Sequence, residues 1–265
     1  QPGDEVLLSN VEFPAAVYTW RGAAEARGLQ LKFIPSANRE FSIDEFERTI
    51  TPRSRVLCLS WVQYFNGFKN DLRAISAMCK KHGIWFIVDG TQGMGAEHVN
   101  VKTADVDMFV ASCQKWMLSP QGGGFFYIRR ELQKLLVPPT MSWQSADWHQ
   151  EFTDLFRYEL PYADSARRFE CGYYVVSNVL GMRQANKLFI ELGIKEIEKH
   201  NHGLIDRLVR YRLGAVDEHG RSDLLRQARE LRHRQDRSQR ARDVRERDQA
   251  RALPEPSLAI LANHR

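Results

Sequence analysis

Short apolar runs alternate with amphipathic segments along the first 130 residues of the chain. The runs contain little polar alternation, which is typical of strands buried on both faces of a sheet. They are Val6–Leu8, Leu31–Ile34, Arg55–Val62 and Ile84–Val88. Between them, apolar side chains recur at helical spacing over Phe13–Ala26 and Asp71–His82. This alternation predicts an α/β fold with a mostly parallel sheet flanked by helices.

Local signals set the expected helix boundaries. Pro14 is tolerated in the first turn of the first helix, and Gly28 ends it. Ser42 is expected to cap a short helix, with Glu45 three residues later completing a capping box. Gly83 is expected as the C-cap of the helix over Asp71–His82.

The remaining chain predicts further elements and one unassigned stretch. Two strands are expected over Met108–Ala111 and Phe125–Ile128, then a short helix over Glu131–Leu136 and long helices over Val175–Leu192 and Ile194–Leu213. The aromatic-rich segment Val137–Asp164 fits neither helical nor strand periodicity.

Composition narrows the class of protein. No apolar run approaches the ~20 residues that cross a bilayer, and Gln1–Glu5 lacks the basic and apolar regions of a signal peptide. The four cysteines are scattered, without zinc-ligand or disulfide-scaffold spacing. We therefore expect a reduced, cytoplasmic setting and no membrane contact.

The net charge of +5 resides in the tail, because the chain from Arg221 onward holds 12 Arg, no Lys and 7 acidic residues. Such a segment is a solvated helix or a disordered tail. A nucleic-acid-binding arm is disfavoured, since the run also lacks Phe, Tyr and Trp.

Polar side chains follow several of the predicted strands. Asp89 ends one strand, Gln63 and Tyr64 follow another, and the cluster Ser112–Lys115 follows a third. Ligands of parallel α/β sheets gather at the carboxyl ends of the strands. The Lys115 ammonium and the Asp89 carboxylate at this edge suit the binding of a small molecule that requires contact with both a cation and an anion.

A lysine amine can form an imine with an aldehyde cofactor, of which pyridoxal phosphate (PLP) is the commonest. The cofactor ring needs an acid beside its nitrogen, hydroxyls for its phosphate and a flat group against one face. Lys115, Asp89, Ser112 and Phe13 are candidates for these roles. Each also has a plainer reading, such as a solvated lysine or a helix-capping Asp89.

Three motifs together resemble the class V aminotransferase family of PLP-dependent enzymes. They are Asp-Gly-Thr-Gln at Asp89–Gln92, Ser-Cys-Gln-Lys at Ser112–Lys115, and the glycine turn with its aromatic strand at Pro120–Tyr127. The resemblance covers Gly3–Leu213 and implies the large domain of the type I fold. The family includes cysteine desulfurases and isopenicillin N epimerase-like proteins.

The resemblance also implies roles for individual residues. Lys115 forms the aldimine with the cofactor and shuttles the proton. Asp89 pairs with the pyridinium nitrogen, Gln92 hydrogen-bonds the phenolic oxygen, and Ser112 binds the phosphate. Phe13 stacks on the ring where many relatives carry His.

Further positions match the family less closely. Arg168, in Arg-Phe-Glu-Cys-Gly, matches the arginine that grips the substrate carboxylate. Tyr64 falls where several relatives have Asn, and Gln114 replaces the usual His before the lysine, close to the phosphate or imine. Trp143 and His149 are candidates to line the substrate pocket.

The resemblance implies a homodimer that acts on an amino acid or a related amine. Transamination, epimerisation and β-elimination all begin with removal of the α-proton, and the sequence does not choose among them. The chain has no Cys between Gln114 and Glu170, which argues against a cysteine desulfurase.

We expect a PLP-binding large domain over 1–175, helices leading toward a small domain over 176–215, and an Arg-rich tail over 216–265. The family's phosphate-binding loop lies upstream of Gly3, and its small domain is not recognisable after Leu213, so the fold is expected to be incomplete at both ends. A truncated or frame-shifted reading of a longer gene would produce this pattern. The alternative function is therefore a catalytically silent scaffold.

Overall fold

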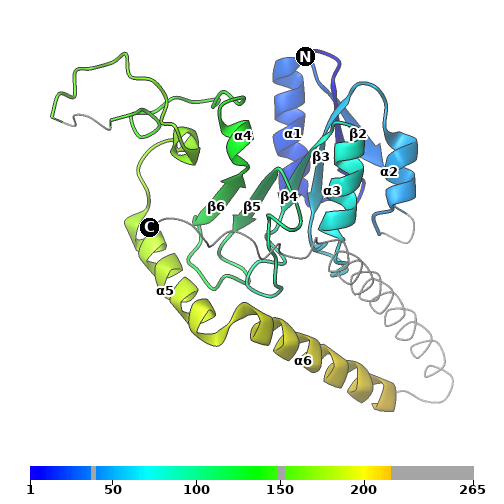
Figure 1. The fold of residues 1–265 in the computed structure, drawn as a ribbon. Helices are drawn as coiled ribbons and strands as arrows, with labels where there is room; N and C mark the ends of the chain where they lie inside the picture. Colours follow the sequence, from blue (N-terminus) through cyan, green and yellow to red (C-terminus); the bar gives the residue numbers. More distant parts are fainter. Residues whose placement is uncertain (37–39, 149–152, 216–265) are drawn as a thin grey trace, which may run out of the picture. The chain divides into compact units, whose positions relative to one another are not determined.

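The computed structural model describes residues 1–36, 40–148 and 153–215, with the backbone alone for 212–215 (Figure 1). It divides into two compact units, Gln1–Asn201 and His202–Arg265. The expected domain boundaries at 175 and 215 remain predictions, and the Arg-rich tail over 216–265 lies outside the described residues.

The first unit contains one six-stranded sheet in the order β2-β1-β3-β4-β5-β6. The strands are β1 (Glu5–Ser9), β2 (Gln30–Ile34), β3 (Ser54–Ser60), β4 (Trp85–Asp89), β5 (Met108–Ser112) and β6 (Gly124–Ile128). The first five run parallel, and β6 pairs with β5 antiparallel. No helix separates β5 from β6, so the chain returns directly and reverses its direction. The predicted mostly parallel sheet is confirmed.

Helices α1 (Pro14–Arg27), α2 (Ile43–Thr49) and α3 (Leu72–Lys81) connect successive strands from β1 to β4 (Figure 1). After β6 the chain forms α4 (Arg130–Gln133), the 3-10 helix η1 (Ala166–Phe169), α5 (Val176–Leu192) and α6 (Ile194–Ala215). The predicted long helices are confirmed to within a few residues. Among the described residues, no helix combines the length and apolar composition that a membrane span requires.

Both faces of the sheet are covered, which explains the lack of alternation in the strands. On one face Phe46 of α2 and Ile75 of α3 join the fully buried Phe86 in the main core. On the other face Ile87 packs with Leu132 of α4 and Phe169 of η1.

The helix caps agree in part with the predictions. Gly28 is the left-handed C-cap of α1, with φ 66°, and Ser42 Oγ accepts a hydrogen bond from Glu45 N at 3.4 Å. The predicted capping box also requires the Glu45 carboxylate to accept a hydrogen bond from Ser42 N. In the structure this carboxylate pairs with Arg48 instead. The prediction of Gly83 as the C-cap of α3 is wrong by one residue: His82 is the C-cap, and Gly83 follows it with φ 66°.

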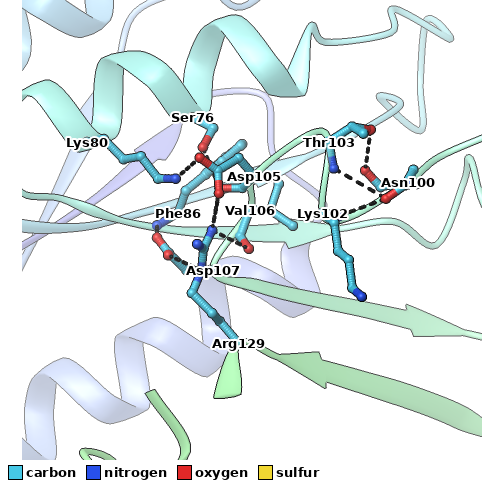
Figure 2. Close-up of polar contacts among 10 residues, drawn as sticks. All are labelled: Ser76, Lys80, Phe86, Asn100, Lys102, Thr103, Asp105, Val106, Asp107 and Arg129. Atoms are coloured by element: carbon cyan, nitrogen blue, oxygen red, sulfur yellow. Dashed lines mark hydrogen bonds and ion pairs between the residues drawn. The ribbon is translucent and has the colours of Figure 1, made fainter. Parts of the chain in front are cut away.

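An ion-pair network fixes the amino edge of β5, opposite the carboxyl edge of the parallel strands (Figure 2). Asp105, in the left-handed region at φ 58°, pairs with Lys80 of α3 and with Arg129 at 2.6 Å. Arg129 also pairs with Asp107 at 3.3 Å, and Asp107 Oδ2 accepts a hydrogen bond from Phe86 N at 2.9 Å. The network ties α3, β4 and β6 to the start of β5.

Candidate functional site

Three of the predicted site residues meet at the carboxyl edge of the sheet. Phe13 follows β1, Tyr64 follows β3 and Lys115 follows β5. Lys115 Nζ lies 5.2 Å from the centroid of the Phe13 ring, within the range of a cation–π contact. The Phe13 and Tyr64 rings meet edge to face, with centroids 5.1 Å apart. Phe13 and Tyr64 remain 38% and 46% exposed, so their rings are open to a ligand.

Asp89 is the last residue of β4, between the strands that carry Tyr64 and Lys115. Its Oδ1 accepts a hydrogen bond from Thr91 N at 2.9 Å. The hydroxyl of Thr91 in turn accepts a hydrogen bond from Ser112 N at 3.2 Å. Thr91 therefore joins Asp89 to Ser112. Nothing in the sequence predicts this role for Thr91, since its bond to Ser112 depends on the pairing of β4 with β5.

Three glycines allow the turn after β4 to pack closely against residues of β5, of the segment after β3 and of the loop after β5. A Cβ at Gly90 would lie 2.0 Å from the Phe109 ring, and one at Gly93 would lie 2.3 Å from the Trp61 ring. Gly95 has φ 90°, and its Cβ would lie 2.3 Å from the carbonyl oxygen of Trp116. Only glycine fits such approaches. They place the turn that carries Gln92, which is half-buried, directly against the loop of Lys115.

The loop after β5 is held by its own backbone. Lys115 O accepts a hydrogen bond from Leu118 N at 3.1 Å, and Cys113 O accepts one from Ser119 N at 3.0 Å. Gln114 is exposed. Cys113 is fully buried, and this burial raises the pKa of its thiol, so it does not supply a ready thiolate.

A buried carboxylate with no predicted role in the site directly precedes Phe13 in the chain. Glu12 is 7% exposed and accepts hydrogen bonds from Ser60 N at 3.1 Å, Ser60 Oγ at 2.6 Å and Gln63 Nε2 at 2.9 Å. Burial raises the pKa of Glu12, the three hydrogen bonds oppose the rise, and the nearby Asp89 carboxylate adds to it. An acid immediately before Phe13 was visible in the sequence, but its burial was not.

Arg168 and Trp143 lie in the segment after α4. The Arg168 guanidinium lies 5.2 Å from the Tyr162 ring centroid, and its Nε is buried without a hydrogen-bond partner. Trp143 packs against Tyr173 with centroids 5.3 Å apart. None of the contacts described for either residue reaches Lys115, and His149 lies outside the described residues.

The sheet order, the covered faces and the polar carboxyl edge define a fold found in solved PLP-enzyme structures. The cysteine desulfurase CsdA (S-sulfonic acid) from Escherichia coli superposes with a TM-score of 0.70 and 26% identity, over 82% of this chain and 52% of that one. A cysteine desulfurase from Thermococcus onnurineus shares the fold, with a TM-score of 0.69 and 24% identity over 81% of this chain and 52% of that one. The predicted large-domain fold of the type I PLP-dependent enzymes is confirmed.

The chain belongs to the aminotransferase class-V family, whose sequence profile matches residues 1–261. The match extends beyond Leu213, the predicted end of the resemblance. An uncharacterized aminotransferase, YcbU of Bacillus subtilis, is 27% identical over 78% of this chain and 53% of its own length. A cysteine desulfurase of Pectobacterium carotovorum is 29% identical over 77% of this chain and 49% of its own length. The chain thus spans about half the length of these relatives.

Proposed function

We propose that this chain is part of a PLP-dependent enzyme that acts on an amino acid or a related amine. The observation that carries the proposal is the position of the Lys115 amine over the Phe13 ring, one strand away from the Asp89 carboxylate. Membership of the aminotransferase class-V family supports it.

The donor set at the carboxyl edge fits PLP. When bound, PLP supplies an aldehyde carbon and a ring that withdraws electrons once its nitrogen is protonated. Asp89 would hold the ring nitrogen, and Phe13 would cover one face of the ring. Ser112 and Gln92 would hold the phosphate and the phenolic oxygen, with Gln114 beside them. Lys115 offers the amine.

Residues of this chain would position the substrate and transfer its proton. The Lys115 amine accepts the proton from the substrate's α-carbon as a general base. Asp89 would pair with the nitrogen of the cofactor ring, and the hydrogen bond from Thr91 N fixes the direction of its carboxylate. Arg168 would bind the substrate carboxylate through its guanidinium, and Tyr64 would flank the substrate.

Proton removal at the α-carbon begins transamination, epimerisation and β-elimination alike. Desulfuration would need a reactive thiol in addition. Cys113 is buried with a raised pKa, and Cys171, although exposed, directly follows the Arg-Phe-Glu motif. We therefore favour transamination, epimerisation or β-elimination over cysteine desulfuration.

The proposal is tested by adding PLP to the full chain. A visible absorbance band should appear on binding, and reduction with borohydride should leave a pyridoxyl label on the peptide that contains Lys115. Lys115→Ala should lose both signals. If the wild-type chain takes up no PLP, the proposal fails, and the scaffold alternative then accounts for the conserved fold.

We further propose a cytoplasmic homodimer, as the family resemblance implies. The exposed apolar side chains Val176, Val179 and Leu180 on α5 provide surface suited to burial in an assembly. Light scattering tests the dimer by measuring the mass of the assembly in solution. The expected mass is twice the 30.7 kDa of one chain, and a single-chain mass across the concentration range would contradict it.

A further inference from the structure

Two buried polar residues each precede one of the two rings at the proposed site. Glu12 precedes Phe13, and Gln63 precedes Tyr64. The side chains of Glu12 and Gln63 are joined by a hydrogen bond from Gln63 Nε2 to Glu12 Oε1 at 2.9 Å. The rings of Phe13 and Tyr64 pack edge to face, with centroids 5.1 Å apart. The two dipeptides are therefore joined twice, once through a buried polar contact and once through an exposed aromatic contact.

The polar contact is anchored to the sheet. Glu12 also accepts hydrogen bonds from the backbone N–H and the hydroxyl of Ser60, the last residue of β3. The Asn70 amide donates to Ser60 O at 2.8 Å. Glu12 thus fixes the β1–α1 turn, which carries Phe13, to the carboxyl end of β3.

Gln63 holds the second turn in the same way. Its carbonyl oxygen accepts a hydrogen bond from Gly67 N at 2.9 Å, which closes the turn that displays Tyr64. Its side chain is 1% exposed, yet Oε1 has no hydrogen-bond partner. An unpaired buried oxygen is unfavourable, and an apolar residue of the same size would avoid it. The same amide group supplies the hydrogen-bond donor to Glu12.

We propose that Glu12 and Gln63 are positioning residues that hold Phe13 and Tyr64 in the ring pair facing Lys115. They act through the rings, because the hydrogen bonds of their side chains join them to each other and to Ser60. The expected effect on PLP binding rests on the proposed function. The ring pair itself is present without any ligand.

Three near-isosteric variants separate this role from simple stabilisation. Gln63→Met keeps the volume and removes the donor to Glu12. Glu12→Gln removes the charge but keeps an oxygen that can accept from Gln63 and Ser60. Asp107→Asn is the matched control, because Asp107 is another buried carboxylate that accepts a backbone hydrogen bond, at the amino edge of the sheet.

The first measurement is the ring–ring nuclear Overhauser effect between selectively labelled Phe and Tyr in the cofactor-free full chain. We expect Gln63→Met to weaken the Phe13–Tyr64 signal at least about threefold, as loss of an aromatic pair contact allows, and Glu12→Gln and Asp107→Asn to preserve it. An unchanged signal in Gln63→Met, or an equal loss in Asp107→Asn, would overturn the inference.

The second measurement is the affinity for PLP, followed by visible absorbance. Gln63→Met should weaken binding by about three- to tenfold, the range that one aromatic contact supplies, whereas Asp107→Asn should not. If the wild-type chain binds no PLP, the proposed function fails and the ring signal alone decides this inference. If the wild type binds PLP and Gln63→Met binds it equally well, this inference fails and the proposed function stands.

Discussion

The ammonium nitrogen of Lys115 lies 5.2 Å from the centroid of the Phe13 ring, although two strands, β3 and β4, separate the strands that the two residues follow. The contact therefore reaches across the carboxyl ends of four neighbouring strands. Asp89 ends β4 and Tyr64 follows β3, the two strands between. Residues far apart in the sequence therefore lie at one edge of the sheet.

Replacement of Phe13 tests this relationship. Phe13→Leu removes the cation–π contact, worth about 0.5–1 kcal/mol at an exposed site, together with the ring that we propose stacks on PLP. We expect PLP affinity to fall by about three- to tenfold, with little change in the free energy of unfolding because the ring is partly exposed. Phe33→Leu on β2, where Phe33 is 46% exposed, is the control and should leave affinity unchanged. Equal affinities in the two variants would contradict the assignment.

The strands could be predicted from the sequence because burial on both faces of the sheet leaves continuous apolar runs. The main helices could be predicted because their apolar side chains recur at helical spacing. The sequence also allowed Lys115 and Asp89 to be selected, since both follow such apolar runs. Glu12 and Thr91 were not selected, because their contacts depend on which strands are neighbours. An isolated acid or hydroxyl carries no periodic signal. The close packing of Gly93 against Trp61 is invisible for the same reason.

The turn after β4 should tolerate no side chain at Gly95. Gly95→Ala places a Cβ at positive φ and against the carbonyl of Trp116, which should destabilise the fold by at least about 2 kcal/mol. Gly22→Ala is the matched control in α1, where a Cβ meets nothing within 4 Å and should stabilise by about 0.5–1 kcal/mol. Urea unfolding of both variants measures the difference, and equal midpoints would be inconsistent with the packing described.

The bridge made by Thr91 should matter for both stability and cofactor binding. Thr91→Val keeps the shape but loses the acceptor for Ser112 N, at a cost of about 1 kcal/mol. Because Asp89 and Ser112 would then be joined less firmly, PLP affinity should also fall. Thr91→Ser retains the hydroxyl and should restore both values toward those of the wild type. Urea unfolding and PLP titration check the pair, and a Thr91→Ser variant as impaired as Thr91→Val would exclude the bridge.

At the opposite edge, Asp105 combines a left-handed backbone with two ion pairs. Asp105→Ala removes both pairs and a residue type that tolerates this conformation. We expect a loss of about 1–2 kcal/mol that shrinks in high salt. The control is Asp164→Ala, which breaks only the exposed pair with Lys134 and should cost less than about 0.5 kcal/mol. Urea unfolding at low and high salt distinguishes them, and PLP affinity should not change in either variant.

Two buried glutamates at opposite ends of β1 should give opposite pH dependences. Burial acts to raise the pKa of Glu5, but hydrogen bonds from Thr51 and Ser54 outweigh it, so its pKa lies below the ordinary value. Burial dominates at Glu12 and leaves its pKa above the ordinary value of 4.5. The ionised form is thus favoured by folding at Glu5 and disfavoured at Glu12.

The sign of each effect follows from linkage. The stability that Glu5 contributes is present above pH 4.5 and is lost as the pH falls through its lowered pKa, so Glu5→Gln should be less stable than the wild type at neutral pH, with the gap closing in acid. The contribution of Glu12 is present below pH 4.5 and is lost as the pH rises through its raised pKa. Glu12→Gln should therefore gain on the wild type as the pH rises. Urea unfolding between pH 3 and 8 (about the range in which carboxyl groups titrate) measures both differences, and slopes of the same sign would refute the opposed environments of the two residues.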